Sequence, residues 1–301
     1  MHFPVSGVEC SPLLLPLVSF VVSSLTASAG VSGAFLLLPF QVSVLGFTSP
    51  AVSPTNLIYN IVATPGGVYR YWKERRMAWP IAWAIIAGTV PGVFAGTLVR
   101  IRFLPDARSF KVFAGCVLMA LGIRLLYQVV RPAGKTWRQP LARTGPAASL
   151  KTRSLSVGRV EFDFREETFS FSPKKLVLLG LAVGLIGGIY GIGGGAIIAP
   201  FLVSVMGLPV YAVAGACLLG TLVASVSGVA SFQLLGFTAI GAGASVHPDW
   251  ALGALFGIGG LFGTYAGARL QKFLPERLIR LFLGVLVGGV ALGYIGQYFL
   301  K

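Results

Sequence analysis

No lysine or arginine occurs between residues 176 and 268, and this long run without basic residues most constrains the fold. A soluble domain carries about 25% charged residues, whereas this chain has 11%, together with 55% hydrophobic residues. Apolar segments of this length form helices in a bilayer, because hydrocarbon offers no other partners to backbone polar groups. The sequence therefore predicts an all-α polytopic membrane protein and excludes an ordinary globular fold.

Glycines interrupt the run at 191–195, where four of five residues are glycine. Backbone N–H groups freed by such a break must be covered by protein or by a watery cavity. A related pattern occurs 161 positions earlier, at 30–34, and each copy continues into an apolar stretch that contains Pro-Phe. We therefore expect two homologous halves, a first transmembrane repeat at 1–130 and a second at 174–301.

Further matches along the chain agree with this duplication. Trp79 corresponds to Trp250, and the sequence Phe-Leu-Pro at 103–105 returns at 273–275. Each half is expected to contain one glycine-broken segment and three transmembrane helices. The broken segments are 12–46 and 174–207, and the expected spans are 50–69, 78–99, 110–130, 209–234, 250–270 and 278–299.

The broken segments can cross the bilayer once or fold back as hairpins. A helix over 12–46 would be about 50 Å long at 1.5 Å per residue, which is too long for a hydrocarbon core of about 30 Å. Single crossings divide the basic residues 15 to eight between the two sides, whereas hairpins divide them 18 to five. Because cytoplasmic loops are enriched in lysine and arginine, we favour hairpins, which turn the halves into inverted repeats. The loops at 131–173 and 269–280 are then cytoplasmic, and both termini lie outside.

Residues 131–173 form a basic extramembrane linker between the halves. We interpret 131–156 as disordered. Apolar and polar residues alternate at 160–165 and again at 168–172, which predicts a small β-hairpin.

A polar stripe follows each break. Asn56, Asn60 and Thr64 recur every four residues and end at Gly67, while Cys217, Thr221 and Ser225 are their counterparts. Residues four apart share one helix face, so the two stripes are expected to converge between the halves. Hydrogen bonding between helices is an alternative role for the stripes, and close helix packing is an alternative role for the glycines.

All nine carboxylates fall in predicted loops or at span ends, so none can serve as a cation ligand or proton relay at the midplane. No metal site, cofactor or enzyme active site is expected. Uncharged hydroxyls, amides and N–H groups at helix starts suit an anion, which would be held without a permanent cation. The second break is expected to need positive φ angles. The candidate substrate-binding residues are Gly30, Ser32, Gly33, Asn56, Asn60, Thr64, Gly191, Gly193, Gly194, Gly195, Thr221 and Ser225.

The net charge of +15 reflects membrane topology rather than nucleic-acid binding, because the 24 basic residues lie between apolar runs. The expected partners are thus a small anion and the lipid bilayer. The sequence leaves the oligomeric state, the coupling ion and the direction of transport open.

These motifs give the chain a family resemblance. The paired breaks, Pro200 and the sequence Ser-Pro-Thr-Asn-Leu at 53–57 resemble those of TauE/SafE sulfite-exporter permeases, over nearly the whole chain except 131–173. The resemblance implies an inner-membrane permease for small anions, often sulfur oxyanions or organosulfonates. Ser32 and Ala34 depart from the glycine-rich form, so the two half-sites differ chemically. A nontransporting scaffold or sensor that acts through the basic central loop is the alternative.

Overall fold

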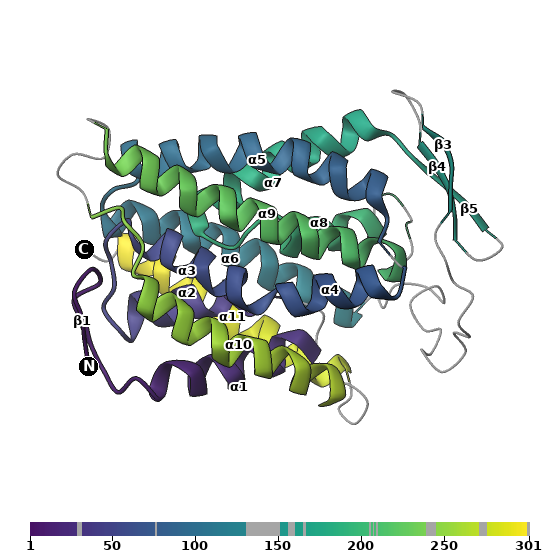
Figure 1. Cartoon of the computed structure of the whole chain (residues 1–301). Helices are drawn as coiled ribbons and strands as arrows, with labels where there is room; N and C mark the ends of the chain where they lie inside the picture. The colour runs from purple at the N-terminus through teal and green to yellow at the C-terminus, as the bar shows by residue number, and fades with distance from the viewer. Residues whose placement is uncertain are drawn as a thin grey trace.

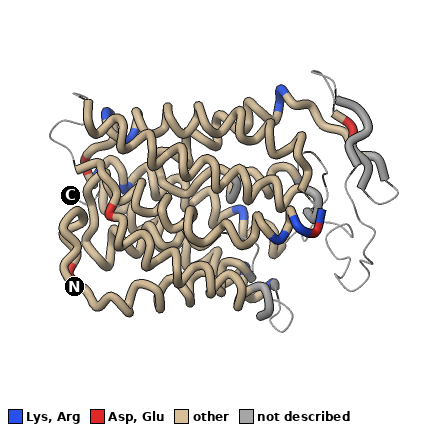
Figure 2. The backbone as a smooth tube through the Cα atoms, viewed as in Figure 1, with Lys and Arg blue, Asp and Glu red and all other residues tan. Residues whose placement is uncertain are grey.

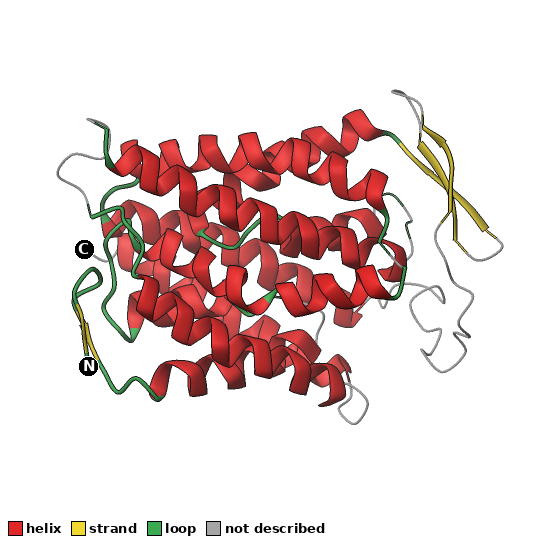
Figure 3. Ribbon diagram, viewed as in Figure 1, coloured by secondary structure: helices red, strands yellow, loops and turns green. Residues whose placement is uncertain are grey.

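The computed structural model is a bundle of nearly parallel and antiparallel helices, with a small sheet beyond one end (Figures 1 and 3). The structure describes residues 1–28, 32–75, 77–130, 151–155, 160–164, 167–204, 206, 208, 210–238, 245–270 and 276–299. The prediction of a mostly helical membrane protein is confirmed.

Helices occupy every segment that the sequence predicts to be apolar. The first half contains α1 (Leu14–Ser28), α2 (Ala34–Ser43), α3 (Val52–Ala63), α4 (Pro65–Lys73), α5 (Trp79–Arg102) and α6 (Ala107–Val130). The second half contains α7 (Pro173–Tyr190), α8 (Gly195–Ser204), α9 (Val210–Gly236), α10 (Trp250–Leu270) and α11 (Glu276–Phe299).

Six of these described helices, α5, α6, α7, α9, α10 and α11, are long and apolar enough to cross a membrane. The helices on either side of the first break, α1 and α2, are apolar but shorter. Together they make a multi-pass membrane protein. The expected span at 50–69 is divided into α3 and α4, because Pro65 has no N–H to donate and starts a new helix.

Three facing helix pairs fix the arrangement of the bundle. α5 and α7 run parallel, since Gly88, Gly92 and Gly96 lie opposite residues 180, 184 and 188 in the same order. A Cβ atom added at Gly92 would lie 2.4 Å from the carbonyl oxygen of Leu181. Glycine therefore lets these two backbones approach closely, as at other membrane helix interfaces.

The contact between α1 and α10 is also parallel. Gly259, Gly263 and Gly267 of α10 face Pro16, Phe20 and Ser24 of α1 in ascending order. By contrast, α6 and α11 run antiparallel, with Gly115 near Ala291 and Gly122 near Gly288. Each half thus supplies one helix to each of these pairs.

The sheet joins β3 (Lys151–Leu155), β4 (Val160–Phe164) and β5 (Glu167–Phe171) in antiparallel order. The predicted hairpin is confirmed by β4 and β5, where Phe162 faces Phe169. The interpretation of 151–155 as disordered is wrong, because these residues pair with β4 as a third strand. Val160 and Phe171 are buried in one cluster with Leu176 of α7, which anchors the sheet on the bundle.

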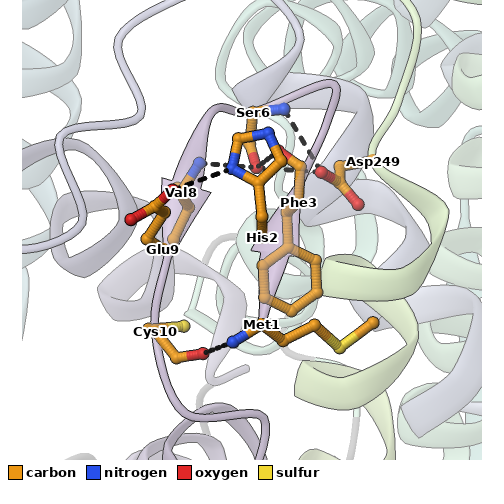
Figure 4. A network of polar contacts seen from close by, with 8 residues as sticks. All are labelled: Met1, His2, Phe3, Ser6, Val8, Glu9, Cys10 and Asp249. Carbon is orange, nitrogen blue, oxygen red and sulfur yellow. Dashed lines mark hydrogen bonds and ion pairs between the residues drawn. The ribbon is translucent and has the colours of Figure 1, made fainter.

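Both termini lie at the end of the bundle opposite the sheet (Figures 1 and 2). There, β1 (His2–Phe3) and β2 (Val8–Glu9) form a second, N-terminal hairpin. The Ser6 N–H and hydroxyl donate to Asp249 Oδ2 at 3.2 and 2.8 Å, as Figure 4 shows. Asp249 Oδ1 accepts from the Leu252 N–H and so caps α10. Because Phe3 is also fully buried, the hairpin covers this end of the bundle.

Candidate functional site

Asn56 on α3 connects the two glycine breaks. Its Nδ2 donates to the carbonyl oxygens of Ala34 and Gly191, both at 2.9 Å. Its Oδ1 accepts from Gln41 Nε2 at 3.1 Å. Ala34 is the first residue of α2, and Gly191 caps the C-terminus of α7, so one buried amide holds both breaks together.

Asn60 makes a second connection one helical turn further along α3. Its Nδ2 donates to the Ile192 carbonyl oxygen at 2.6 Å, and its Oδ1 accepts from the Ser32 hydroxyl at 3.5 Å. The Ser32 oxygen also accepts from the Ala34 N–H at 3.3 Å. The sequence predicts that the two stripes converge between the halves, and the structure places both asparagines between the two breaks.

The second stripe reaches the same break from α9. Gly193 is so close to α9 that an added Cβ atom would lie 2.8 Å from Ser225 Oγ and 2.9 Å from Thr221 Cγ2. The Thr221 hydroxyl donates to the Cys217 carbonyl of its own helix at 2.9 Å. Ser225 is 0% exposed, and its hydroxyl has no hydrogen-bond partner among the described residues. A buried hydroxyl without a partner is unfavourable, which marks Ser225 as a group available to a ligand.

Backbone angles at the second break differ in part from expectation. Gly191 and Gly193 adopt positive φ angles of 88° and 74°, whereas Gly194 does not. Gly194 is constrained instead by Thr89 of α5, whose Cγ2 would lie 2.7 Å from an added Cβ. Glycine is thus required at 191 and 193 by conformation and at 194 by close packing.

The other predicted site residues lie less centrally. The Thr64 hydroxyl donates to the carbonyl of Asn60 in its own helix, at the junction with α4. Gly33 lies against the hydrogen-bonded hydroxyls of Ser23 and Tyr59. Gly195 is the first residue of α8, and Gly30 lies outside the described residues.

The polarity of the breaks favours a negative ligand. Carbonyl groups near the C-terminus of α7 accept from Ser53, Asn56 and Asn60, which offsets the negative end of that helix. The starts of α2 and α8 also lie at the breaks, and first-turn N–H groups of a helix have no intrahelical acceptor. Such helix starts carry partial positive charge and bind anions.

Arg100 is a residue that sequence reasoning missed. It was assigned to a loop between spans, but it lies within α5 and is 0% exposed. Its Nε donates to Ser53 Oγ at 3.3 Å, and the Ser53 hydroxyl in turn donates to the Ile189 carbonyl at 2.8 Å. Arg100 thus places a permanent cation beside Ser53, one helical turn before Asn56 on α3, whereas the sequence predicts a site without one. One signal was present, because Arg100 continues the every-fourth-residue spacing of Gly88, Gly92 and Gly96.

A multi-pass helical bundle in which two broken helices meet around buried polar groups defines a membrane transport protein. The chain belongs to the TauE/SafE sulfite exporter family, which matches residues 15–294. It is 19% identical over 283 residues to the Bacillus subtilis (strain 168) protein named "Probable membrane transporter protein YunE". That alignment covers 91% of this chain and 94% of the relative. No solved structure matches the chain.

Proposed function

We propose that this protein is an inner-membrane permease for small anions, of the sulfur oxyanion or organosulfonate class. The observation that carries the proposal is the pair of asparagines, Asn56 and Asn60, which satisfy carbonyl groups at both breaks. The carbonyl groups of Ala34, Gly191 and Ile192 are thereby occupied, while the Ser225 hydroxyl and Gln41 Oε1 are without a partner in the described part of the chain. Occupied carbonyl groups and an unpartnered hydroxyl donor beside two helix starts favour an anion over a cation.

We further propose alternating access between inverted halves. The antiparallel contact of α6 and α11 supports this, since each helix follows a Phe-Leu-Pro sequence at the equivalent place in its half. Broken helices that meet between inverted repeats are typical of secondary transporters. Because Asn60 touches both breaks, rearrangement of one half would be transmitted to the other.

Flux into proteoliposomes tests the proposal, with sulfite, thiosulfate, sulfoacetate, taurine and oxalate offered separately. Asn60→Leu should abolish flux while the protein remains folded. Thr264→Val is the matched control, because its hydroxyl donates to the Gly260 carbonyl of its own helix, α10, and its flux should be retained. Hydrogen bonds between membrane helices average about 0.6 kcal/mol, so a purely structural Asn60 would tolerate the change. Wild-type flux in folded Asn60→Leu would contradict the proposed site.

The alternative function, a scaffold or sensor that acts through the central loop, is tested separately. Val160 and Phe171 pack on the bundle, so deleting the whole loop would remove packing as well as charge. Replacing Arg131, Lys135, Arg138 and Arg143 by glutamine removes charge and keeps the strands. A permease should retain its flux in this variant. The sensor hypothesis predicts instead that the membrane-embedded helices are unchanged while the signalling phenotype is lost.

A further inference from the structure

The guanidinium of Arg100 is buried, and among the described residues it makes no ion-pair contact with a carboxylate, although the charge of Asp106 acts on it from a longer distance. In the described part of the chain, the recorded ion pairs are His2 with Glu9 and Arg70 with Glu74. Arg100 Nη1 donates to the Leu104 carbonyl, and the guanidinium carbon lies 3.9 Å from the centre of the Phe110 ring. These contacts hold the side chain in place but carry no negative charge, and the charge of Asp106 acts only from beyond ion-pair distance.

One guanidinium nitrogen remains unused. Arg100 Nη2 is buried and has no hydrogen-bond partner among the residues that the structure describes. A buried charged donor that is left unpaired is strongly unfavourable. The Leu104 carbonyl accounts for Nη1, and the Ser53 hydroxyl accounts for Nε, but neither accounts for Nη2.

The surroundings of Arg100 add further positive potential. Ser53 belongs to the first turn of α3, and the cap residue of that helix, Ala51, makes no side-chain hydrogen bond. The positive end of α3 thus lies beside the guanidinium. The nearby C-terminal carbonyl of Ile189 is already occupied by the Ser53 hydroxyl. An anion would relieve this concentration of positive charge.

Ser53, Asn56 and Asn60 lie three and four residues apart, so they share one face of α3. Along this face, their side chains donate in turn to the carbonyls of Ile189, Gly191 and Ile192. Arg100 contacts the first of the three. A continuous line of polar groups therefore connects the guanidinium with the second break.

We propose that Arg100 and Ser53 form an oxyanion-binding station beside the break, on the side of the bundle where the termini lie. This proposal rests on the proposed anion transport and adds a residue with a permanent charge to it. Once Nε exchanges its bond to Ser53 for the anion, Nη2 and Nε form a fork that fits two oxygens of a sulfite, sulfate or sulfonate group. When the station is occupied, the Ser53 hydroxyl donates to the anion instead of to the Ile189 carbonyl. Because Nη2 is closed to solvent here, the anion enters when α3 and the end of α7 separate.

Equilibrium binding of [³⁵S]sulfate and [³⁵S]sulfite to the purified full-length protein tests the station. Arg100→Gln should raise Kd at least tenfold, which corresponds to about 1.4 kcal/mol. Arg100→Lys keeps the charge but loses the fork, so its Kd should fall between those of the wild type and Arg100→Gln. Arg102→Gln removes an equal charge from the same helix end at an exposed position, and its Kd should equal that of the wild type. Monodispersity and thermal denaturation verify that each variant is folded.

Where Arg100→Gln does not fold, Ser53→Ala replaces it and should raise Kd at least threefold. Equal Kd values for wild type and folded Arg100→Gln would overturn the station, as would the absence of binding by the wild type. Arg100-dependent binding without flux of any offered anion would contradict the permease and leave the station standing. Flux of an offered anion together with Arg100-independent binding would overturn the station and leave the permease standing.

Discussion

Among single residues, substitution of Ser225 best distinguishes a structural role from a role in substrate binding. Its hydroxyl is buried and without a partner in the described structure, beside Gly193. Ser225→Ala should therefore leave thermal stability unchanged or slightly higher, because no hydrogen bond is lost. Anion flux should fall about threefold to tenfold if the hydroxyl donates to the substrate, a range equal to 0.5 to 1.5 kcal/mol. A folded variant with wild-type flux would exclude Ser225 from the site.

Residue chemistry explains which parts of the site could be foreseen. Asn56 and Asn60 were predictable, because amides spaced by four in an apolar helix must face protein. Their side chains bind carbonyls of the breaks instead of facing an open cavity. This arrangement depends on tertiary contacts between distant segments, so it could not be foreseen. Arg100 was missed because a cation near a span end is ordinarily solvated, and here packing against Ser53 of α3 and Phe110 of α6 buries it.

At the scale of elements, the contact between α5 and α7 should depend on glycine. Gly92→Leu would place side-chain atoms where the Leu181 carbonyl lies. Overpacking typically costs about 1–3 kcal/mol, so this variant should denature at a clearly lower temperature. Gly289→Leu is the control, because Gly289 of α11 is exposed and a Cβ there would meet nothing within 4 Å. Equal denaturation temperatures for the two variants would contradict close backbone packing.

The start of α6 depends on a carboxylate cap. Asp106 Oδ2 accepts from the Ser109 N–H at 2.7 Å, and this bond lowers the pKa of the Asp106 carboxyl below its usual 3.8. A lowered pKa stabilises the folded protein above the unfolded-state pKa, and the contribution is lost as pH falls through the folded-state pKa. Asp106→Ala should cost about 1 kcal/mol at neutral pH. The difference from wild type, measured by denaturation, should shrink as pH falls below about 4. A difference that is independent of pH would contradict the cap.

Helix positions followed closely from apolar runs, whereas two smaller elements did not. The strand β3 lies in a basic stretch without the apolar alternation that marks β4, so its pairing with β4 could not be predicted from the sequence pattern. The N-terminal hairpin is too short to give a periodic pattern, and Asp249, far along the chain, holds it. The predicted span at 50–69 divides at Pro65. The proline alone did not identify a helix boundary, because prolines also occur within α2 and α5.

For the whole molecule, the arrangement in Figure 1 makes a topological prediction. In a background with the three native cysteines (Cys10, Cys116 and Cys217) replaced, Glu9→Cys and Asp106→Cys should react with an impermeant maleimide from the periplasm. Ser172→Cys and Arg277→Cys should react only after the membrane is opened. The enrichment of basic residues on cytoplasmic sides is the reason for this orientation. Labelling of positions 9 and 277 from the same side would contradict the hairpin arrangement.

The glycine contacts also bear on how such a chain could have arisen. α5 of the first half packs along α7 of the second, and α10 of the second packs along α1 of the first. A polypeptide containing the first half alone would expose the glycine face of α5 to lipid, and one containing the second half alone would expose those of α7 and α10. Under the proposed inversion, which the antiparallel α6–α11 contact supports, a second copy inserted in the opposite direction would cover them. An ancestral single half would then have been a dual-topology dimer, and fusion of two copies would have fixed the orientation of each.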